Sequence, residues 1–223
     1  TGVQGALLSC TGCSLLDNKF AGAVLSAGSS MEISSSTISG TTEYSDIGGG
    51  VGVFAGQHSD DFGPSSLHLE DNIISDNIVA GVYLGEDGHY LLEGNTIASS
   101  SGVPHGVTTR CGDGVYAEGT TAWDGNSGLL VKENTLCGNT GAGLFLHEAA
   151  AMVDGNTWIE NAPDLLAQGE SCLGYTDDYT DAPSRDICPE WDQPTCDLQF
   201  HRGIALESIE PSMFFPGGPP QQG

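Results

Sequence analysis

Basic residues are scarce in this sequence. Five Lys and Arg residues stand against 30 Asp and Glu residues, which gives the 223-residue chain a formal net charge of −25. A surface of this sign repels the phosphate backbones of nucleic acids and the head groups of anionic membranes. The composition therefore argues against nucleic acid and membrane insertion, and leaves divalent cations and neutral polymers as the plausible partners.

Long apolar runs are also missing. No apolar stretch reaches the roughly 18 residues of a membrane-spanning helix. No signal peptide is visible and the chain opens at Thr1, so we expect a mature or trimmed fragment. Strong helix formers such as Lys, Arg and Gln are few, whereas Gly accounts for 33 residues, which argues against long helices.

Two short motifs alternate along the chain. In the first, an apolar residue is followed by two spacers, Asn, one spacer and an apolar residue; its copies begin at Leu15, Leu69, Leu92, Val131 and Val153, with a Ser variant at Ile33. The second motif is Gly, apolar, variable, apolar, and its copies begin at Gly22, Gly52, Gly81, Gly114 and Gly143. Each unit of about 21–24 residues is too small to bury its own apolar face, so the units are expected to stack.

These motifs resemble the right-handed parallel β-helix repeats of the pectate-lyase-like superfamily, over roughly residues 5–167. The resemblance implies an all-β solenoid of about six to seven coils with an irregular, cysteine-containing C-terminal cap. It also implies a ladder of inward side chains at a tight turn, formed by Asn18, Ser36, Asn72, Asn95, Asn134 and Asn156. The alternative is an antiparallel β-sandwich, which has no reason to repeat Asn at a fixed offset.

The composition changes near residue 170. Three of the seven cysteines and seven of the ten prolines fall in residues 171–223. We therefore expect a β-helix domain over 1–170, a disulfide-linked cap or lid over 171–210, and a tail or linker over 211–223.

The variable position of the second motif is aromatic in four successive coils, at Phe54, Tyr83, Tyr116 and Phe145. If these rings point outward from stacked coils, they form a column on which sugar rings can stack. The alternative is cross-strand stacking that stabilises the sheet without a ligand, with the insertions 56–66 and 118–128 covering the rings. Ligand binding requires that the four rings share one face and that at least two are accessible.

A second candidate row is charged: Glu70, Glu93, Lys132 and Asp154 each stand two residues before a motif Asn. Carboxylates on adjacent coils could act as a glycosidase pair or share a cation. The alternative is a solvated edge on which Lys132 pairs with its neighbours. Asp177, Asp178 and Asp181 could hold calcium through carboxylate oxygens, against the alternative of a solvated acidic loop. No cofactor is required, and calcium is possible.

Seven cysteines in an acidic, Lys-poor chain suggest an oxidising compartment, so we expect an extracellular or cell-surface protein, with the periplasm as another possibility. Cys10 and Cys13 are close enough in sequence for a local disulfide. Cys111 and Cys137 fall in the turn regions of adjacent coils, which predicts a second bridge. Cys172 is expected to pair with Cys188 or Cys196.

Enzymes of the superfamily that the chain resembles use calcium with an Arg or Lys base, or a polygalacturonase-type set of Asp, His and Arg motifs. Neither set is found here, and Asp60-Asp61 is the one Asp pair in a coil loop. The expected function is a scaffold that binds polysaccharide or surface glycan without catalysis. The alternatives are a carbohydrate-active enzyme, either a lyase or a glycoside hydrolase, and a purely structural adhesin or stalk segment.

Overall fold

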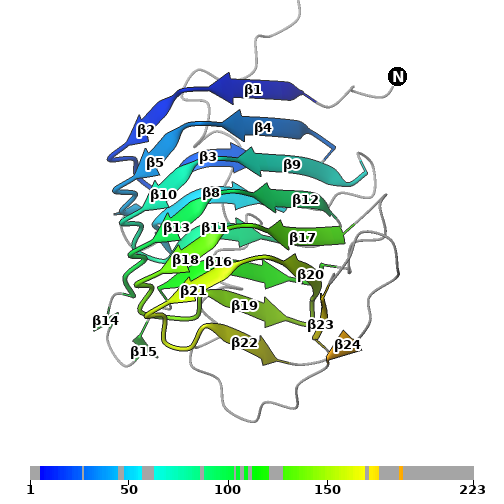
Figure 1. The fold of residues 1–223 in the computed structure, drawn as a ribbon. Helices are drawn as coiled ribbons and strands as arrows, with labels where there is room; N and C mark the ends of the chain where they lie inside the picture. Colours follow the sequence, from blue (N-terminus) through cyan, green and yellow to red (C-terminus); the bar gives the residue numbers. More distant parts are fainter. Residues whose placement is uncertain are drawn as a thin grey trace, which may run out of the picture.

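A computed structural model describes residues 6–26, 28–44, 48–56, 63–85, 88–102, 104–105, 108–109, 112–120, 128–168, 171–175 and 186–187. The described chain is all β. It winds in coils that stack on one another, and each coil adds one strand to each of three parallel sheets (Figure 1). The part of the chain that the structure describes contains no helix able to cross a membrane. The predicted parallel β-helix of about six coils is confirmed, and the β-sandwich alternative is wrong.

The first sheet, sheet I, has eight strands. Its order is β1 (Leu7–Thr11), β4 (Ser30–Ser34), β9 (Ser65–Glu70), β12 (Gly88–Glu93), β17 (Gly128–Lys132), β20 (Ala150–Asp154), β23 (Cys172–Tyr175) and β24 (Asp186–Ile187). All neighbours are parallel except β24, which runs antiparallel to β23. This reversal ends the parallel stacking of sheet I.

The other two large sheets have six strands each. Sheet II contains β2 (Ser14–Leu16), β5 (Thr37–Ser39), β10 (Ile73–Ser75), β13 (Thr96–Ala98), β18 (Thr135–Cys137) and β21 (Thr157–Ile159). Sheet III contains β3 (Ala21–Leu25), β8 (Val51–Ala55), β11 (Ala80–Leu84), β16 (Asp113–Glu118), β19 (Leu144–His147) and β22 (Leu165–Gln168). Two small hairpins, β6 (Glu43–Tyr44) with β7 (Gly48–Gly49) and β14 (Pro104–His105) with β15 (Thr108–Thr109), arise within insertions.

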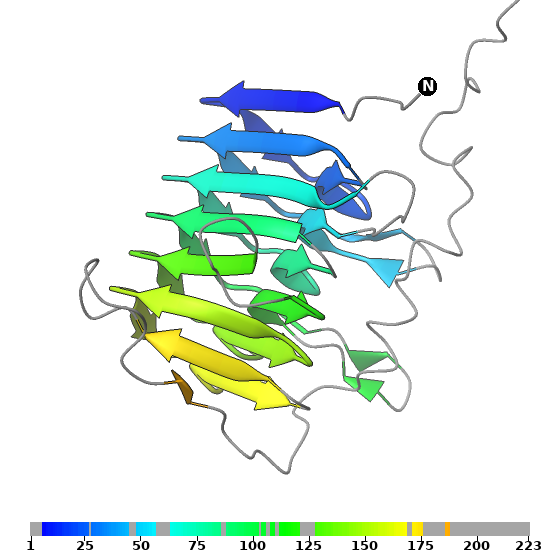
Figure 2. The same cartoon turned by 90° about the vertical axis from the view of Figure 1, so that its right-hand side faces the viewer.

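Period-2 alternation places one set of apolar side chains inside every coil. In sheet II the middle residue of each strand points inward, so Ile38, Ile74 and Ile97 stack in register and are fully buried. Residues from all three sheets join them in one continuous hydrophobic core. Figure 2, turned by 90°, shows the coils as parallel layers. Each coil therefore buries its apolar residues only because the next coil covers them.

The turn from sheet I to sheet II carries the first ladder, which consists of Cys13, Ser36, Asn72, Asn95, Asn134 and Asn156. The backbone N–H of Asn72 donates to Asn95 Oδ1 at 3.0 Å, and Asn95 N–H donates to Asn134 Oδ1 at 2.9 Å. Each Asn amide also donates to a core-strand carbonyl, as Asn95 Nδ2 does to Leu69 O at 2.8 Å. The predicted ladder is thus confirmed for Ser36 and the four later Asn residues.

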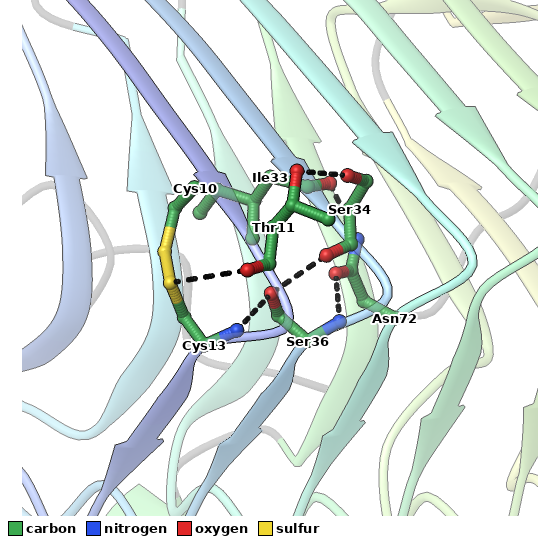
Figure 3. The surroundings of a disulfide bond; sticks show 7 residues. All are labelled: Cys10, Thr11, Cys13, Ile33, Ser34, Ser36 and Asn72. Carbon is green, nitrogen blue, oxygen red and sulfur yellow. Dashed lines mark hydrogen bonds between the residues drawn. A yellow bond between two sulfur atoms is a disulfide. The ribbon is translucent and has the colours of Figure 1, made fainter.

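The first coil departs from the expected ladder. Leu15 pairs with Ile38, which places Cys13 and not Asn18 beside Ser36. Cys13 N–H donates to Ser36 Oγ at 2.9 Å (Figure 3). Asn18 instead follows the other end of β2. The expected position of Asn18 was therefore wrong, because the repeat motif was read five residues out of register in this coil.

A second ladder, not predicted, flanks the other end of sheet II. Its members follow those of the first ladder by five residues: Asn18, Thr41, Asn77, Ser100, Asn139 and Asn161. Thr41 N–H donates to Asn77 Oδ1 at 3.1 Å, and Ser100 N–H donates to Asn139 Oδ1 at 3.0 Å. The repeated spacing of Asn72 with Asn77 and of Asn134 with Asn139 was the sequence signal for it.

Both ladders use one turn geometry. The residue before each ladder member has a positive φ, as Asp71 (53°) and Glu133 (54°) have in the first ladder and Asp76 (56°) has in the second. Asn tolerates a left-handed backbone, but in both ladders the residue before the ladder member adopts it. The left-handed residue instead turns the chain, and the next side chain is thereby aimed at the neighbouring coil.

Candidate functional site

The four predicted aromatic residues stand in register on sheet III. Tyr83 pairs with Phe54 on one side and with Tyr116 on the other, and Tyr116 pairs with Phe145. The ring centroids of successive pairs lie 4.8, 5.1 and 5.0 Å apart. The first two contacts are stacked and the third is edge-on. The rings therefore form one aromatic column, and the expectation of a shared face is confirmed.

The expectation that at least two of these rings are accessible is wrong. The exposed fractions are 3% for Phe54, 7% for Tyr83, and 0% for Tyr116 and Phe145. Around the rings pack further buried apolar residues, namely Val51, Val79, Ala80, Ala142 and Leu166, which form a second hydrophobic cluster outside the coil interior. Rings enclosed in this way stabilise the sheet by cross-strand contact and offer no face to a sugar. The column is therefore not a glycan-binding platform in this structure.

A polar cluster of Tyr83, Glu118, His147 and Gln168 lies at the C-terminal end of the strands of sheet III. Parallel register places Glu118 beside His147 and His147 beside Gln168. The Tyr83 hydroxyl donates to Glu118 Oε2 at 3.0 Å, and Glu118 Oε1 lies 3.5 Å from His147 Nδ1. The cluster therefore takes one polar side chain from each of four successive coils.

The polar cluster is largely enclosed but reaches the surface at Glu148. His147 and Gln168 are both more than nine-tenths buried, whereas the Glu148 side chain is 61% exposed and its Oε1 lies 3.9 Å from His147 Nε2. Among the described residues, His147 Nδ1 and Gln168 Oε1 are buried and have no hydrogen-bond partner. Buried polar atoms without a hydrogen-bond partner lower the stability of the fold, so a further polar group at this position would be stabilising.

Sequence reasoning did not single out this cluster. The signal was present in the second motif, since Gly56, Gly85, Glu118 and His147 each stand four residues after its first Gly. In the first two of these coils the position is Gly, and the change to charged and titratable residues begins at Glu118. Comparison of equivalent repeat positions, and not the spacing between histidines, would have found it.

A buried carboxyl, that of Asp113, lies at the start of β16. Burial raises the pKa of Asp113 to about 8, although the hydrogen bond that its Oδ1 accepts from Ala142 N at 2.7 Å lowers it. The protonated form is therefore favoured in the folded protein. Asp113 occupies the register position of Ala80 in the preceding coil, so its carboxyl replaces a small apolar side chain.

The charged row expected on sheet I is in register, since Glu93 pairs with Glu70 and with Lys132. Lys132 Nζ lies 2.6 Å from Glu93 Oε1 and 3.7 Å from Glu133 Oε1. The ammonium group therefore neutralises the carboxylate that a glycosidase pair would require. The alternative of an edge on which Lys132 pairs with its neighbours is confirmed.

The cysteines follow the prediction only in the first coil. Cys10 and Cys13 are joined by a disulfide with a Cα–Cα distance of 6.1 Å (Figure 3). Cys137 is a free thiol, so the predicted bridge to Cys111 is wrong. In sheet II the residues beside Cys137 are Ala98 and Ile159, which leaves no cysteine next to it in the described sheet. Cys111, Cys188 and Cys196 lie outside the described residues, and Cys172 begins β23, where its side chain is not described.

The predicted calcium ligands Asp177, Asp178 and Asp181 also lie outside the described residues. Among the residues that the structure does describe, no group of three or more His, Cys, Asp or Glu side chains could hold a metal ion.

A family model described as the right-handed β-helix region matches residues 4–176 of the chain. This range includes all the residues of the three large sheets up to β23. No curated protein and no solved structure matches the chain.

Proposed function

Because the chain belongs to the right-handed β-helix family, we propose that it is an extracellular or cell-surface scaffold that binds a neutral polysaccharide without catalysis. The observation that carries this proposal is the outer face of sheet II. The side chains on this face are regular and none of them is charged, although the chain has a net charge of −25 and Asp76 at the edge of the face accepts from Ser39 and Ser75.

The outer face of sheet II is built from the first and third residues of its three-residue strands. The first row is Ser14, Thr37, Ile73, Thr96, Thr135 and Thr157, and the second row is Leu16, Ser39, Ser75, Ala98, Cys137 and Ile159. None of these twelve described positions carries a charge. Parallel pairing repeats the pattern along the stack at about 4.8 Å per coil.

The chemistry of this face suits a neutral polysaccharide. Its hydroxyl groups can donate to and accept from sugar hydroxyls. Leu16, Ile73 and Ile159 are 52%, 52% and 45% exposed, and they offer apolar contact to the C–H faces of sugar rings. Without charges the face loses little hydration energy on binding, whereas an acidic polymer would be repelled by the rest of the surface.

Retention of the protein on insoluble cellulose, chitin and neutral β-glucan tests the proposal. The wild type should be depleted from solution by at least one of these polymers. Ile73→Asp and Thr135→Asp should each weaken retention about tenfold, because a carboxylate would be desolvated at the contact. Leu91→Asp, which changes the outer face of sheet I, is the matched control and should bind as the wild type does.

Three results would contradict the proposal. Equal retention of all variants would remove sheet II as the binding face. Absence of retention on every polymer would favour the structural stalk, and release of reducing ends or unsaturated uronates from a polymer would favour the carbohydrate-active enzyme. The extracellular location is supported by the Cys10–Cys13 disulfide, since such bonds persist in oxidising compartments.

A further inference from the structure

The first strand of sheet I has one open edge. Among the described strands, β1 pairs with β4 and with no other, and it lies at the end of the stack of coils (Figure 1). Ala6 O accepts from Ser30 N at 2.8 Å, so the backbone groups of Ala6 point toward β4. Because these groups alternate in direction along a strand, those that point away from β4 belong to Leu7, Ser9 and Thr11. The open edge therefore presents backbone donors and acceptors to a further strand.

The hydrophobic core is also open at this end of the stack. Leu8 pairs with Met31 at an inward position, but Leu8 is 52% exposed whereas Met31 is 3% exposed. Leu7, on the outer side of the same strand, is 77% exposed. In the later coils the residues in register with Leu8 are buried, because another coil covers them. A strand added to β1 would therefore pair its backbone groups and also cover an apolar side chain.

Charge determines which partner fits this edge. Residues 6–26 contain one acidic residue, Asp17, and one basic residue, Lys19, although the whole chain has a net charge of −25. A basic partner would be attracted to the acidic remainder of the surface, and an acidic partner would be repelled by it. The edge thus fits an uncharged strand with an apolar inward residue. The first coil of a second copy provides such a strand, and this contact keeps the acidic later coils of the two copies on opposite sides.

We propose that two copies of the chain associate through β1, with the two β1 strands antiparallel about Ser9. Ser9 then faces Ser9 of the second copy, and Leu7 faces Thr11 of the second copy. Both are hydrogen-bonded pairs, because the backbone groups of these residues point toward the open edge. Leu8 faces Cys10 of the second copy on the inward side, so the two cores become continuous. The pairing uses the open edge of both copies and is therefore complete at a dimer.

Sedimentation velocity of the full chain, at concentrations from micromolar to millimolar, tests the dimer. The wild type should shift from the mass of one chain to that of two as the concentration rises. Amide hydrogen exchange in β1 should slow over the same range, because its open edge becomes paired. A monomer at every concentration would overturn the inference. Slow exchange in β1 at every concentration would also overturn it, because another segment of the same chain would then cover the edge.

Charged substitutions at Ser9 test the register of the pairing. Ser9→Asp and Ser9→Lys should each weaken the dimer about tenfold or more, because like charges then face each other across the two strands. An equimolar mixture of the two variants should recover the dimer, because the facing charges are then opposite. Ser66→Asp makes the same exchange on the outer side of β9, inside the stack, and should leave the dimer unchanged. A mixture that dimerises no better than either variant alone would contradict the pairing.

This inference does not depend on polysaccharide binding, since β1 belongs to sheet I and the proposed binding face to sheet II. A dimer that is retained on no polymer supports the pairing of β1 and contradicts the proposed function. Retention of a chain that stays monomeric does the reverse. The measurements on the wild type require no variant, so a folding defect in a Ser9 variant does not prevent the test.

Discussion

The two ladders that flank sheet II share one backbone geometry but differ in how well their side chains are satisfied. All six first-ladder residues are described, and none carries a buried nitrogen or oxygen without a partner. In the second ladder, four consecutive members each carry one buried atom that has no hydrogen-bond partner among the described residues. These atoms are Asn18 Nδ2, Thr41 Oγ1, Asn77 Nδ2 and Ser100 Oγ. The difference follows from residue type, because the left-handed turn residue precedes the ladder member in both.

The two unpaired amides of the second ladder, Asn18 Nδ2 and Asn77 Nδ2, have the same origin. In the first ladder Asn72 Nδ2 donates to Asn95 Oδ1 at 3.0 Å. In the second ladder the residue after Asn77 is Ser100, whose shorter side chain does not meet the Asn77 amide. Asn18, which is followed by Thr41, repeats this mismatch two coils earlier. The backbone therefore determines the turn. The consecutive amides of Asn72, Asn95, Asn134 and Asn156 determine that the first-ladder turns are fully hydrogen-bonded.

Removal of a first-ladder amide should lower the stability of the protein more than any other change considered below. Asn95→Ala deprives Asn72 N–H and Nδ2 of their acceptor and leaves Leu69 O without its donor. We expect a loss of about 3 kcal/mol in the free energy of unfolding, measured by urea denaturation. Asn18→Ala is the control and should cost less, because Asn18 Nδ2 has no partner to lose. Equal losses would mean that the two ladders contribute alike.

A buried carboxyl beside the second ladder should make stability depend on pH. Asp113 has a pKa of about 8 in the folded protein against its ordinary value of 3.8, so the folded state binds the additional proton between these values. The contribution of Asp113 to stability therefore falls as the pH rises from about 4 to about 8. Asp113→Asn keeps an acceptor for Ala142 N and should gain stability relative to the wild type across this range. A difference between the two proteins that does not change with pH would contradict the assignment.

The Cys10–Cys13 disulfide should stabilise only the first coil, where the first ladder begins. The double variant Cys10→Ser, Cys13→Ser should lose about 2 kcal/mol by the loop-closure estimate for so short a loop. Faster hydrogen exchange is expected in β1 and β2, because these strands pair only with β4 and β5. Cys137→Ser is the control, since Cys137 is not bridged. Uniformly faster exchange in all coils would show that the disulfide supports the whole solenoid.

Completion of the second ladder should change the stability least, and it should raise the free energy of unfolding. Ser100→Asn supplies an amide that can accept from Asn77 Nδ2, as Asn95 accepts from Asn72. We expect a gain of about 1 kcal/mol in the free energy of unfolding. Ser36→Asn in the first ladder is the comparison, and it should gain less because Ser36 Oγ already accepts from Cys13 N–H and donates to Ser34 O.

The sequence was sufficient for the repeating parts of the fold. The position of Asn inside the first motif located Asn72, Asn95 and Asn134 correctly, because every coil must meet the same neighbours. The register failed at Asn18, where the short disulfide-bonded turn of the first coil moves the ladder to Cys13. A terminal coil has only one neighbour, so its residues are less constrained by the repeat.

The candidate site was less predictable for a different reason. Position in the repeat placed Tyr83 and Tyr116 on one face, but accessibility depends on what covers that face. Part of this cover comes from Val51, Val79 and Ala80, which stand directly before the Gly motif and were not counted in it. Glu118 and His147 were visible only as departures from Gly at equivalent positions, and their contact required the parallel register.

Cys137 allows a direct test of the central claim, that the two ladders hold sheet II as a flat face for a neutral polysaccharide. Its thiol lies on that face between Ala98 and Ile159. The rate at which iodoacetamide alkylates Cys137 should be measured by peptide mass spectrometry, with and without the polymer that retains the protein. The account predicts that bound polymer slows alkylation of Cys137 severalfold and that the substitution Ile73→Asp abolishes this protection. An alkylation rate that is the same with and without bound polymer would contradict it.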